Sequence, residues 1–181
     1  VDEDSIQRLL QGCPLLEHLI LTVQPFSYAS ESEESIEVEV LHISSPLLKV
    51  LVLCWNEKVE LEFTVVVKSE NLETLVCSLE GQHKVIVDAP NLKSLNVEGD
   101  VLEVHIIQSL VSIDKAVVRA EFLHNVTNLG DLFLRVQHAF EFISGLQNVK
   151  SLNLSENILK VCFLFSVFFN LGWLLSFSFN F

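Results

Sequence analysis

An apolar skeleton of fixed spacing recurs along the chain and limits what it can fold into. In each copy a first apolar anchor is followed by a second three residues later and by a third two residues after that. Spacings between successive first anchors are 32, 24, 20, 21, 36 and 22 residues, and four of these six fall in the roughly 20–29-residue range of one repeat class. The first anchors are Leu16, Leu48, Leu72, Leu92, Ile113, Val149 and Leu171.

This skeleton reads L-x-x-L-x-L, which is the core of a leucine-rich repeat. The full repeat continues x-x-N-x-L, and the copy that starts at Val149 completes it with Asn157 and Leu159. We therefore expect residues 1–181 to form a single leucine-rich-repeat domain, an α/β solenoid that is mostly β. Its parallel strands would lie at L-x-L on the concave side.

Two gaps between anchors are longer than the repeat allows. The first contains the acidic stretch from Ser30 to Glu39, which we interpret as an insertion. The second contains Leu129, Leu132 and Leu134, which have the same spacing of three and then two residues. This trio predicts a degenerate extra coil, so either seven or eight coils remain open.

The segments between the anchors alternate as strands do. The stretch from Val59 to Val67 places an apolar residue at every second position, and 36–40, 84–87 and 102–106 are short runs rich in β-branched residues. Short strands or irregular segments are therefore expected on the convex side. Only the stretch from Asp4 to Gln11, followed by Gly12, has the apolar stripe and end signal of a helix.

Composition excludes several functions. The formal net charge is −13 and no Lys/Arg cluster occurs, which argues against nucleic acid and anionic membrane surfaces as partners. No P-loop, G-x-S-x-G or H-E-x-x-H motif is found, so no catalytic residue, enzyme activity or cofactor is expected.

Cysteine usage also argues against a metal site. None of the four cysteines, Cys13, Cys54, Cys77 and Cys162, forms a C-x-x-C pair or lies beside a His at ligand spacing. Three of them fall in apolar runs, as free thiols do in a reducing compartment. No secretory signal is visible, and we expect a cytoplasmic or nuclear location.

Both ends of the chain are unusual. It begins with Val and contains no Met, so we expect a piece of a longer protein whose N-terminal part is missing. Residues 161–181 carry no charge and are long enough for a membrane helix. Asn170, Gly172 and several serines favour instead an eroded last coil or an apolar tail, and a membrane partner is not favoured. Because this end lacks a polar cap, the chain alone is expected to aggregate.

The candidate binding residues follow from strand geometry. Residues that flank the L-x-L leucines point out of the concave sheet, because successive side chains alternate between its faces. They are apolar in the first coils and polar later, and a contiguous apolar strip commonly marks an interface. The expected protein-binding residues are Ile20, Thr22, Val52, Cys54, Val76, Ser78, Asn96, Glu98, Val117, Arg119, Asn153 and Ser155.

Several phrases of the sequence resemble one family, the plant F-box proteins with leucine-rich repeats that commonly end in an FBD domain. The phrases are Asp4–Leu10, Gly12–Leu19, Leu41–Pro46, Ile86–Leu92 and Asn148–Leu152, in the order in which that family carries them. Together they cover roughly residues 1–157.

The resemblance implies a substrate receptor of an SCF-type ubiquitin ligase, whose repeats hold the protein to be ubiquitinated. In that family an F-box docks on a Skp-type adaptor and, through it, a cullin. Neither an F-box pattern nor an FBD domain is recognisable in these residues, so adaptor docking is assigned to none of them. The alternative is a stand-alone, repeat-only interaction or decoy protein outside any ligase. The sequence does not identify the bound protein.

Overall fold

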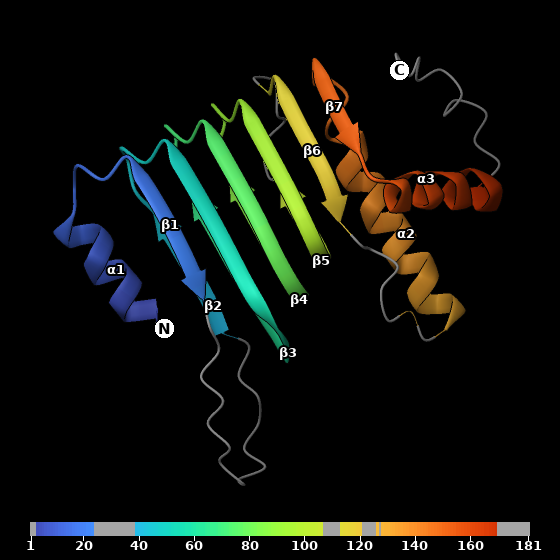
Figure 1. The fold of residues 1–181 in the computed structure, drawn as a ribbon, viewed down its shortest axis with the longest axis horizontal. Helices are drawn as coiled ribbons and strands as arrows, with labels where there is room; N and C mark the ends of the chain where they lie inside the picture. The colour runs from blue at the N-terminus through green and yellow to red at the C-terminus, as the bar shows by residue number, and fades with distance from the viewer. Residues whose placement is uncertain (1–2, 24–38, 107–112, 121–125, 127, 170–181) are drawn as a thin grey trace, which may run out of the picture.

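The fold was determined as a computed structural model, which describes residues 3–23, 39–106, 113–120, 126 and 128–169. Helices cap both ends of a stack of parallel strands (Figure 1). In chain order the elements are α1 Glu3–Gly12, β1 His18–Val23, β2 Glu39–Ser44, β3 Val50–Lys68, β4 Thr74–Asp88, β5 Ser94–Ile106, β6 Lys115–Ala120, α2 Leu129–Ser144, β7 Ser151–Leu154 and α3 Glu156–Phe169.

The strands are arranged as the repeat predicts. They follow the order β1-β3-β4-β5-β6-β7, all paired in parallel, with β2 beside β3 off this path. Cross-strand partners are the equivalent positions of successive repeats, so Leu19, Leu51, Leu75 and Leu95 stand in one row. The expected α/β solenoid with parallel strands at L-x-L is confirmed.

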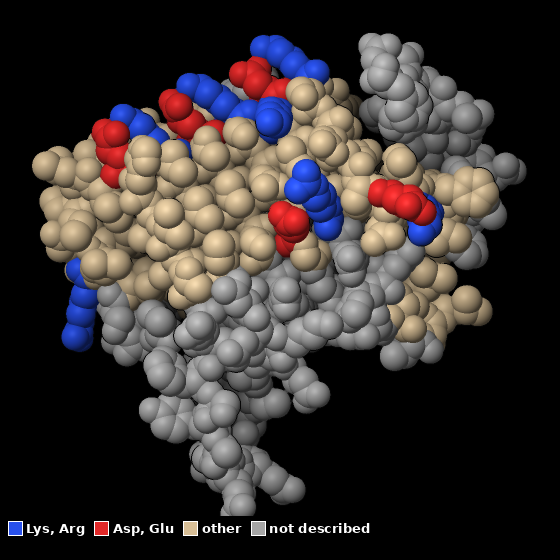
Figure 2. Space-filling view, in the orientation of Figure 1, with Lys and Arg blue, Asp and Glu red and all other residues tan. Residues whose placement is uncertain are grey.

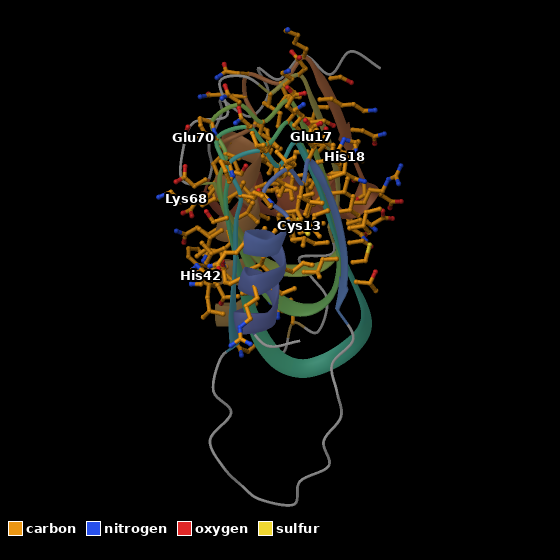
Figure 3. The ribbon with its side chains drawn as sticks, turned by 90° about the vertical axis from the view of Figure 1, so that its left-hand side faces the viewer. Cys13, Glu17, His18, His42, Lys68 and Glu70 are labelled. Atoms are coloured by element: carbon orange, nitrogen blue, oxygen red, sulfur yellow. The ribbon has the colours of Figure 1, made fainter. Side chains whose placement is uncertain are left out.

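Three strands run through both sides of the solenoid. β3, β4 and β5 have 19, 15 and 13 residues, and the pairing between them shifts register midway. Their first halves lie with β1, β6 and β7 in what we call the front sheet, and their second halves lie with β2 in the back sheet. Viewed end-on, Glu17 and His18 lie on the front side and Lys68 and Glu70 on the back (Figure 3). Strands on the convex side are thus confirmed, but they continue the front strands without a break.

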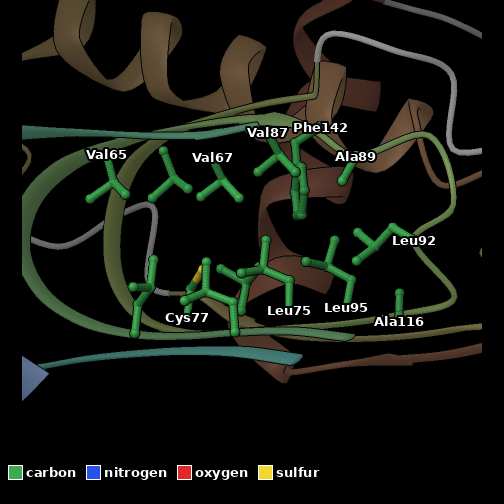
Figure 4. Packing of buried hydrophobic residues seen from close by; sticks show 14 of the residues in the cluster. Val65, Val67, Leu75, Cys77, Val87, Ala89, Leu92, Leu95, Ala116 and Phe142 are labelled. Atoms are coloured by element: carbon green, nitrogen blue, oxygen red, sulfur yellow. The ribbon is translucent and has the colours of Figure 1, made fainter. Parts of the chain in front are cut away.

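The core fills the space between the two sheets. Val65, Val67 and Val87 from the back sheet face Leu75 and Leu95 from the front sheet (Figure 4). All five side chains are buried. Alternation along each strand produces this result, because every second residue of both halves points inward.

The helix α1 agrees with the expected N-terminal helix. Ile6 and Leu10, one turn apart on its apolar face, are buried in the common core. The helix therefore closes the N-terminal end of the space between the sheets, as a capping element of a solenoid must.

The degenerate coil expected around Leu129, Leu132 and Leu134 is wrong, because these residues lie in α2. Asn128 caps this helix: its side-chain oxygen accepts a hydrogen bond of 2.9 Å from the backbone N–H of Asp131. Val136, Ala139, Phe142 and Ile143 are buried on one face of the helix. The helix contacts β5 and α3, where a further back strand would otherwise stand.

The expected coil over residues 161–181 is also wrong for its described part. Val161 to Phe169 belong to α3, which begins at Glu156, so Asn157 and Leu159 of the preceding repeat are helical as well. Phe165 of α3 stacks on Phe140 of α2 with ring centroids 3.8 Å apart. The anchor Leu171 lies outside the described residues. Among the described helices, none combines the length and apolarity needed to cross a bilayer.

Polar side chains connect the turns between successive coils. Asn91 Nδ2 donates to the carbonyl of Glu70 at 2.8 Å, and Asn71 Nδ2 donates to that of Pro46 at 2.5 Å. Ser69 Oγ, which is buried, donates to the carbonyl of Ser45 at 2.8 Å. Backbone carbonyls that no strand partner reaches are satisfied in this way.

The cysteines should differ sharply in reactivity. Cys13 is exposed, whereas Cys77 is fully buried in the inward row and burial raises its thiol pKa to about 12. Since the thiolate is the reactive form, native protein at pH 8 is expected to label at Cys13 and not at Cys77. Differential alkylation read by mass spectrometry checks this, with the urea-unfolded chain as the control. Equal labelling of both thiols in native buffer would contradict the fold.

Candidate protein-binding surface

The outward side chains of the front sheet form rows that cross the strands. The row nearest the middle contains Ile20, Val52, Val76, Asn96, Val117 and Asn153. The row that follows it contains Thr22, Cys54, Ser78, Glu98 and Arg119. These are eleven of the twelve candidate residues, and none of them is fully buried. The structure therefore brings them together on one face.

Ser155 differs from the other candidates. It follows β7 and precedes α3, and its backbone N–H donates to the carbonyl of Val118 at 2.9 Å. It extends the edge of the face where β7 ends and contributes no side chain to a strand row.

A third row was missed by the sequence analysis. His18, Val50, Thr74, Ser94, Lys115 and Ser151 are in register at the start of the strands. They lie two residues before the middle row and so point to the same side. The alternation rule already contains this signal; only the residues next to the leucines had been considered. The outward face is three residues deep on each long strand.

The chemistry of this face changes along the solenoid. At the β1 end, Ile20 is 71% exposed and is followed by Val52 and Val76. Further along, Glu98 Oε1 and Arg119 Nη1 lie 3.9 Å apart and both side chains are about half exposed. A long, exposed pair of this kind contributes little to stability. These two charges therefore remain available to a partner.

Asn96 carries an unsatisfied polar atom in the middle of the face. Its Oδ1 is buried and accepts no hydrogen bond from the described residues. The neighbours across the strands are Val76 and Val117, which have no side-chain donor. A buried acceptor without a donor costs about 1–3 kcal/mol. A donor on a bound partner would remove that cost.

A row of charges follows the edge where each coil enters its front strand (Figure 2). The residue after each of the first six anchors is charged, and its sign alternates from coil to coil. We call this row the charge ladder. Its members are Glu17, Lys49, Glu73, Lys93, Asp114 and Lys150.

Ion pairs join neighbouring members of the charge ladder. The nitrogen–oxygen distances are 2.8 Å for Lys49–Glu17, 2.9 Å for Lys93–Glu73 and 2.6 Å for Lys150–Asp114. The hydrogen bond from Lys49, with its charge, lowers the pKa of Glu17, and the same contact raises the pKa of Lys49. These pairs are exposed, so they favour the correct register between coils more than they add stability. The alternation becomes visible once the repeats are aligned.

Metal chemistry finds no support in the described part of the chain. No group of three or more His, Cys, Asp or Glu side chains there could hold an ion. What the described residues do offer is an extended face with both apolar and polar rows.

Comparison with known proteins identifies the family. A family model described as "FBD-associated F-box protein At5g56370, LRR repeats" matches residues 1–143. The chain belongs to this leucine-rich-repeat family. The matched residues include β1 to β6, and with them most of the outward face. The resemblance stated from the sequence phrases is confirmed.

A curated relative supports the same assignment. The F-box/FBD/LRR-repeat protein At5g22660 of Arabidopsis thaliana is 27% identical over 164 residues. The match covers 82% of this chain and 34% of the relative, so the chain spans about a third of that protein's length. No solved structure matches the chain. Membership in this family indicates a protein-interaction repeat region, of a kind that is typically not enzymatic.

Proposed function

We propose that this chain is the substrate-recognition repeat region of an F-box protein that serves an SCF-type ubiquitin ligase. The observation that carries the proposal is the outward face of the front sheet, which lies in the part of the chain that matches the family. Solenoid sheets of this kind use their exposed face to bind proteins. The partner is the protein to be ubiquitinated.

The face would bind such a protein with two kinds of contact. Its apolar end, at Ile20, Val52 and Val76, gains from removing exposed apolar surface from water. Farther along, Asn96 offers its unsatisfied oxygen and Arg119 a charged side chain. The apolar contacts supply affinity, and the polar contacts fix where the partner lies.

The ligase itself would be reached through other parts of the longer protein. A Skp-type adaptor and a cullin would bind through an F-box, and none of the residues of this chain is assigned to that contact. We propose a cytoplasmic or nuclear location, where ligases of this class act. The four free cysteines are consistent with a reducing compartment, and the net charge of −13 argues against nucleic acid as a partner.

Affinity capture of the full-length gene product, in parallel with residues 1–181, tests this function. With the proteasome inhibited, the full-length protein is expected to co-purify a Skp-type adaptor, a cullin and a further protein. Residues 1–181 should retain that further protein and lose the other two. If the full-length protein brings down a partner but neither adaptor nor cullin, the ligase role fails and the repeat-only interaction or decoy protein takes its place.

A further inference from the structure

The two ends of the front sheet are open strand edges. In the described part of the chain, β1 pairs with β3 alone and β7 pairs with β6 alone. An open edge presents unpaired N–H and C=O groups, which are a template for another strand. What could pair at each edge is limited by the rule that governs every internal boundary of the solenoid.

That rule is the same at each step from one coil to the next. The carbonyl of one charge-ladder residue accepts two N–H groups, from the next ladder residue and from the residue after it. Lys49 and Val50 donate to Glu17 at 2.8 and 3.0 Å, and at the far end Lys150 and Ser151 donate to Asp114 at 3.1 and 2.9 Å. The three boundaries between them repeat the pattern. Neighbouring ladder side chains of opposite sign are thereby placed side by side.

The two ends of the ladder carry opposite charges. Glu17 begins it and Lys150 ends it, and each has a ladder neighbour on one side alone among the described residues. The Lys150 side chain is 79% exposed although it pairs with Asp114. An acid placed beyond Lys150, or a base placed beyond Glu17, would continue the alternation. The protein's own opposite end meets each requirement.

Apolar surface is left at both ends as well. Leu152 belongs to the inward row and yet is 39% exposed, whereas its row neighbours Leu51, Leu75 and Leu95 are buried. Leu159, on the adjoining helix α3, is equally exposed. At the other end, Leu9 of α1 and Leu15 before β1 are exposed. These positions are where one more coil would cover the core.

We propose that β7 of one copy of this chain pairs in parallel with β1 of a second copy, continuing the solenoid head to tail. The carbonyl of Lys150 then accepts from the backbone N–H groups of Glu17 and His18 of the second copy. Lys150 and that Glu17 become ladder neighbours. Strand pairing and apolar burial hold the joint, while the charges fix its direction and register. This inference does not depend on the proposed ligase role.

Such a joint has a recognisable assembly behaviour. It joins two different surfaces, so each added copy leaves the same two ends open. The assembly is therefore expected to grow with concentration, in contrast to a closed dimer of fixed mass. Because the ladder charges are exposed, salt should weaken their effect on the joint.

Charge reversal at each end, alone and in mixture, tests the joint. Glu17→Lys makes both ends basic, and Lys150→Glu makes both ends acidic, so each variant alone should associate roughly tenfold more weakly than wild type at low salt. In an equimolar mixture every joint between unlike chains again brings Lys beside Glu, and association should return. Sedimentation velocity or light scattering across a concentration series measures this. Each chain keeps its own internal change in the mixture, so recovery cannot come from refolding.

Lys93→Glu is the matched control. It removes the ion pair with Glu73 inside the ladder and leaves both ends unchanged, so it should associate as wild type does. A wild-type chain that stays monomeric at all concentrations would overturn the proposal. So would a dimer of constant mass, or a mixture whose average mass equals the mean of the two variants measured separately. Growth that ignores both end charges would indicate unspecific apolar aggregation, and the proposal would fall with it.

Discussion

Replacing Leu75 with Ala is expected to lower the free energy of unfolding by about 2–5 kcal/mol. The Leu75 side chain is 0% exposed and stands in the inward row of the front sheet between Leu51 and Leu95. Shortening it removes buried methyl groups and leaves a cavity that neighbouring strands cannot fill, because their register is fixed on both sides. Since whole domains are stable by only about 5–15 kcal/mol, this loss is large. Urea unfolding followed by circular dichroism measures it.

Val76→Ala is the control for this experiment. Val76 follows Leu75 on the same strand, but its side chain points to the opposite face and is partly exposed. Its loss should change the free energy of unfolding by a small fraction of the Leu75 effect. In a solenoid, coils are stabilised through contacts with their immediate neighbours, so damage to a central coil weakens contacts on both sides. Similar unfolding midpoints for the two variants would contradict the assignment of inward and outward faces.

The front sheet was predictable from the sequence because its signal is local and repeated. Three apolar positions at fixed spacing determine which face of the strand is buried, and one residue of slippage would expose all of them. Leu51, Leu75 and Leu95 therefore occupy equivalent positions in the structure as in the alignment. The back strands were predictable for the same reason, since Val65, Val67, Val85 and Val87 alternate as strongly.

The helices near the C-terminus were not predicted, because the spacing of Leu129, Leu132 and Leu134 fits a degenerate repeat. What decides between the two folds is capping: Asn128 satisfies the first turn of α2, and Gly145 donates its backbone N–H to the last turn. Reading these signals first would have identified α2. The helical state of Glu156–Phe169 is harder to foresee, because it depends on packing against α2 through Phe140 and Phe165.

The candidate surface was predictable in outline and not in detail. Strand alternation alone selects which residues point outward. The unsatisfied oxygen of Asn96 depends on which residues stand beside it, and that requires the register between coils. Repeat lengths that vary from 20 to 36 residues conceal this register in the sequence. The charge ladder was concealed in the same way, although each member directly follows an anchor.

Placing Asp at both Val52 and Val76 is expected to abolish capture of the bound protein while the fold persists. The two side chains are cross-strand partners in the apolar part of the outward face and are partly exposed. In the free protein each carboxylate remains hydrated, so the cost of folding is small. In a complex both carboxylates would lose water against an apolar surface, which should weaken binding more than about tenfold per substitution. Pull-down of the partner identified by affinity capture, with circular dichroism as the folding check, measures both effects.

The same two strands provide the matched control on the other side of the solenoid. Val66 and Ile86 are cross-strand partners in the second halves of β3 and β4, they are also partly exposed, and they face outward from the back sheet. Val66→Asp with Ile86→Asp introduces the same charges into the same pair of strands, so a general effect of acidity or of weakened strands would appear in both variants. Loss of capture in the front-sheet variant alone assigns binding to the front face. Equal loss in both, or retained capture by the front-sheet variant, would remove the front face from the binding site, because two buried carboxylates cannot be tolerated in the centre of an apolar contact.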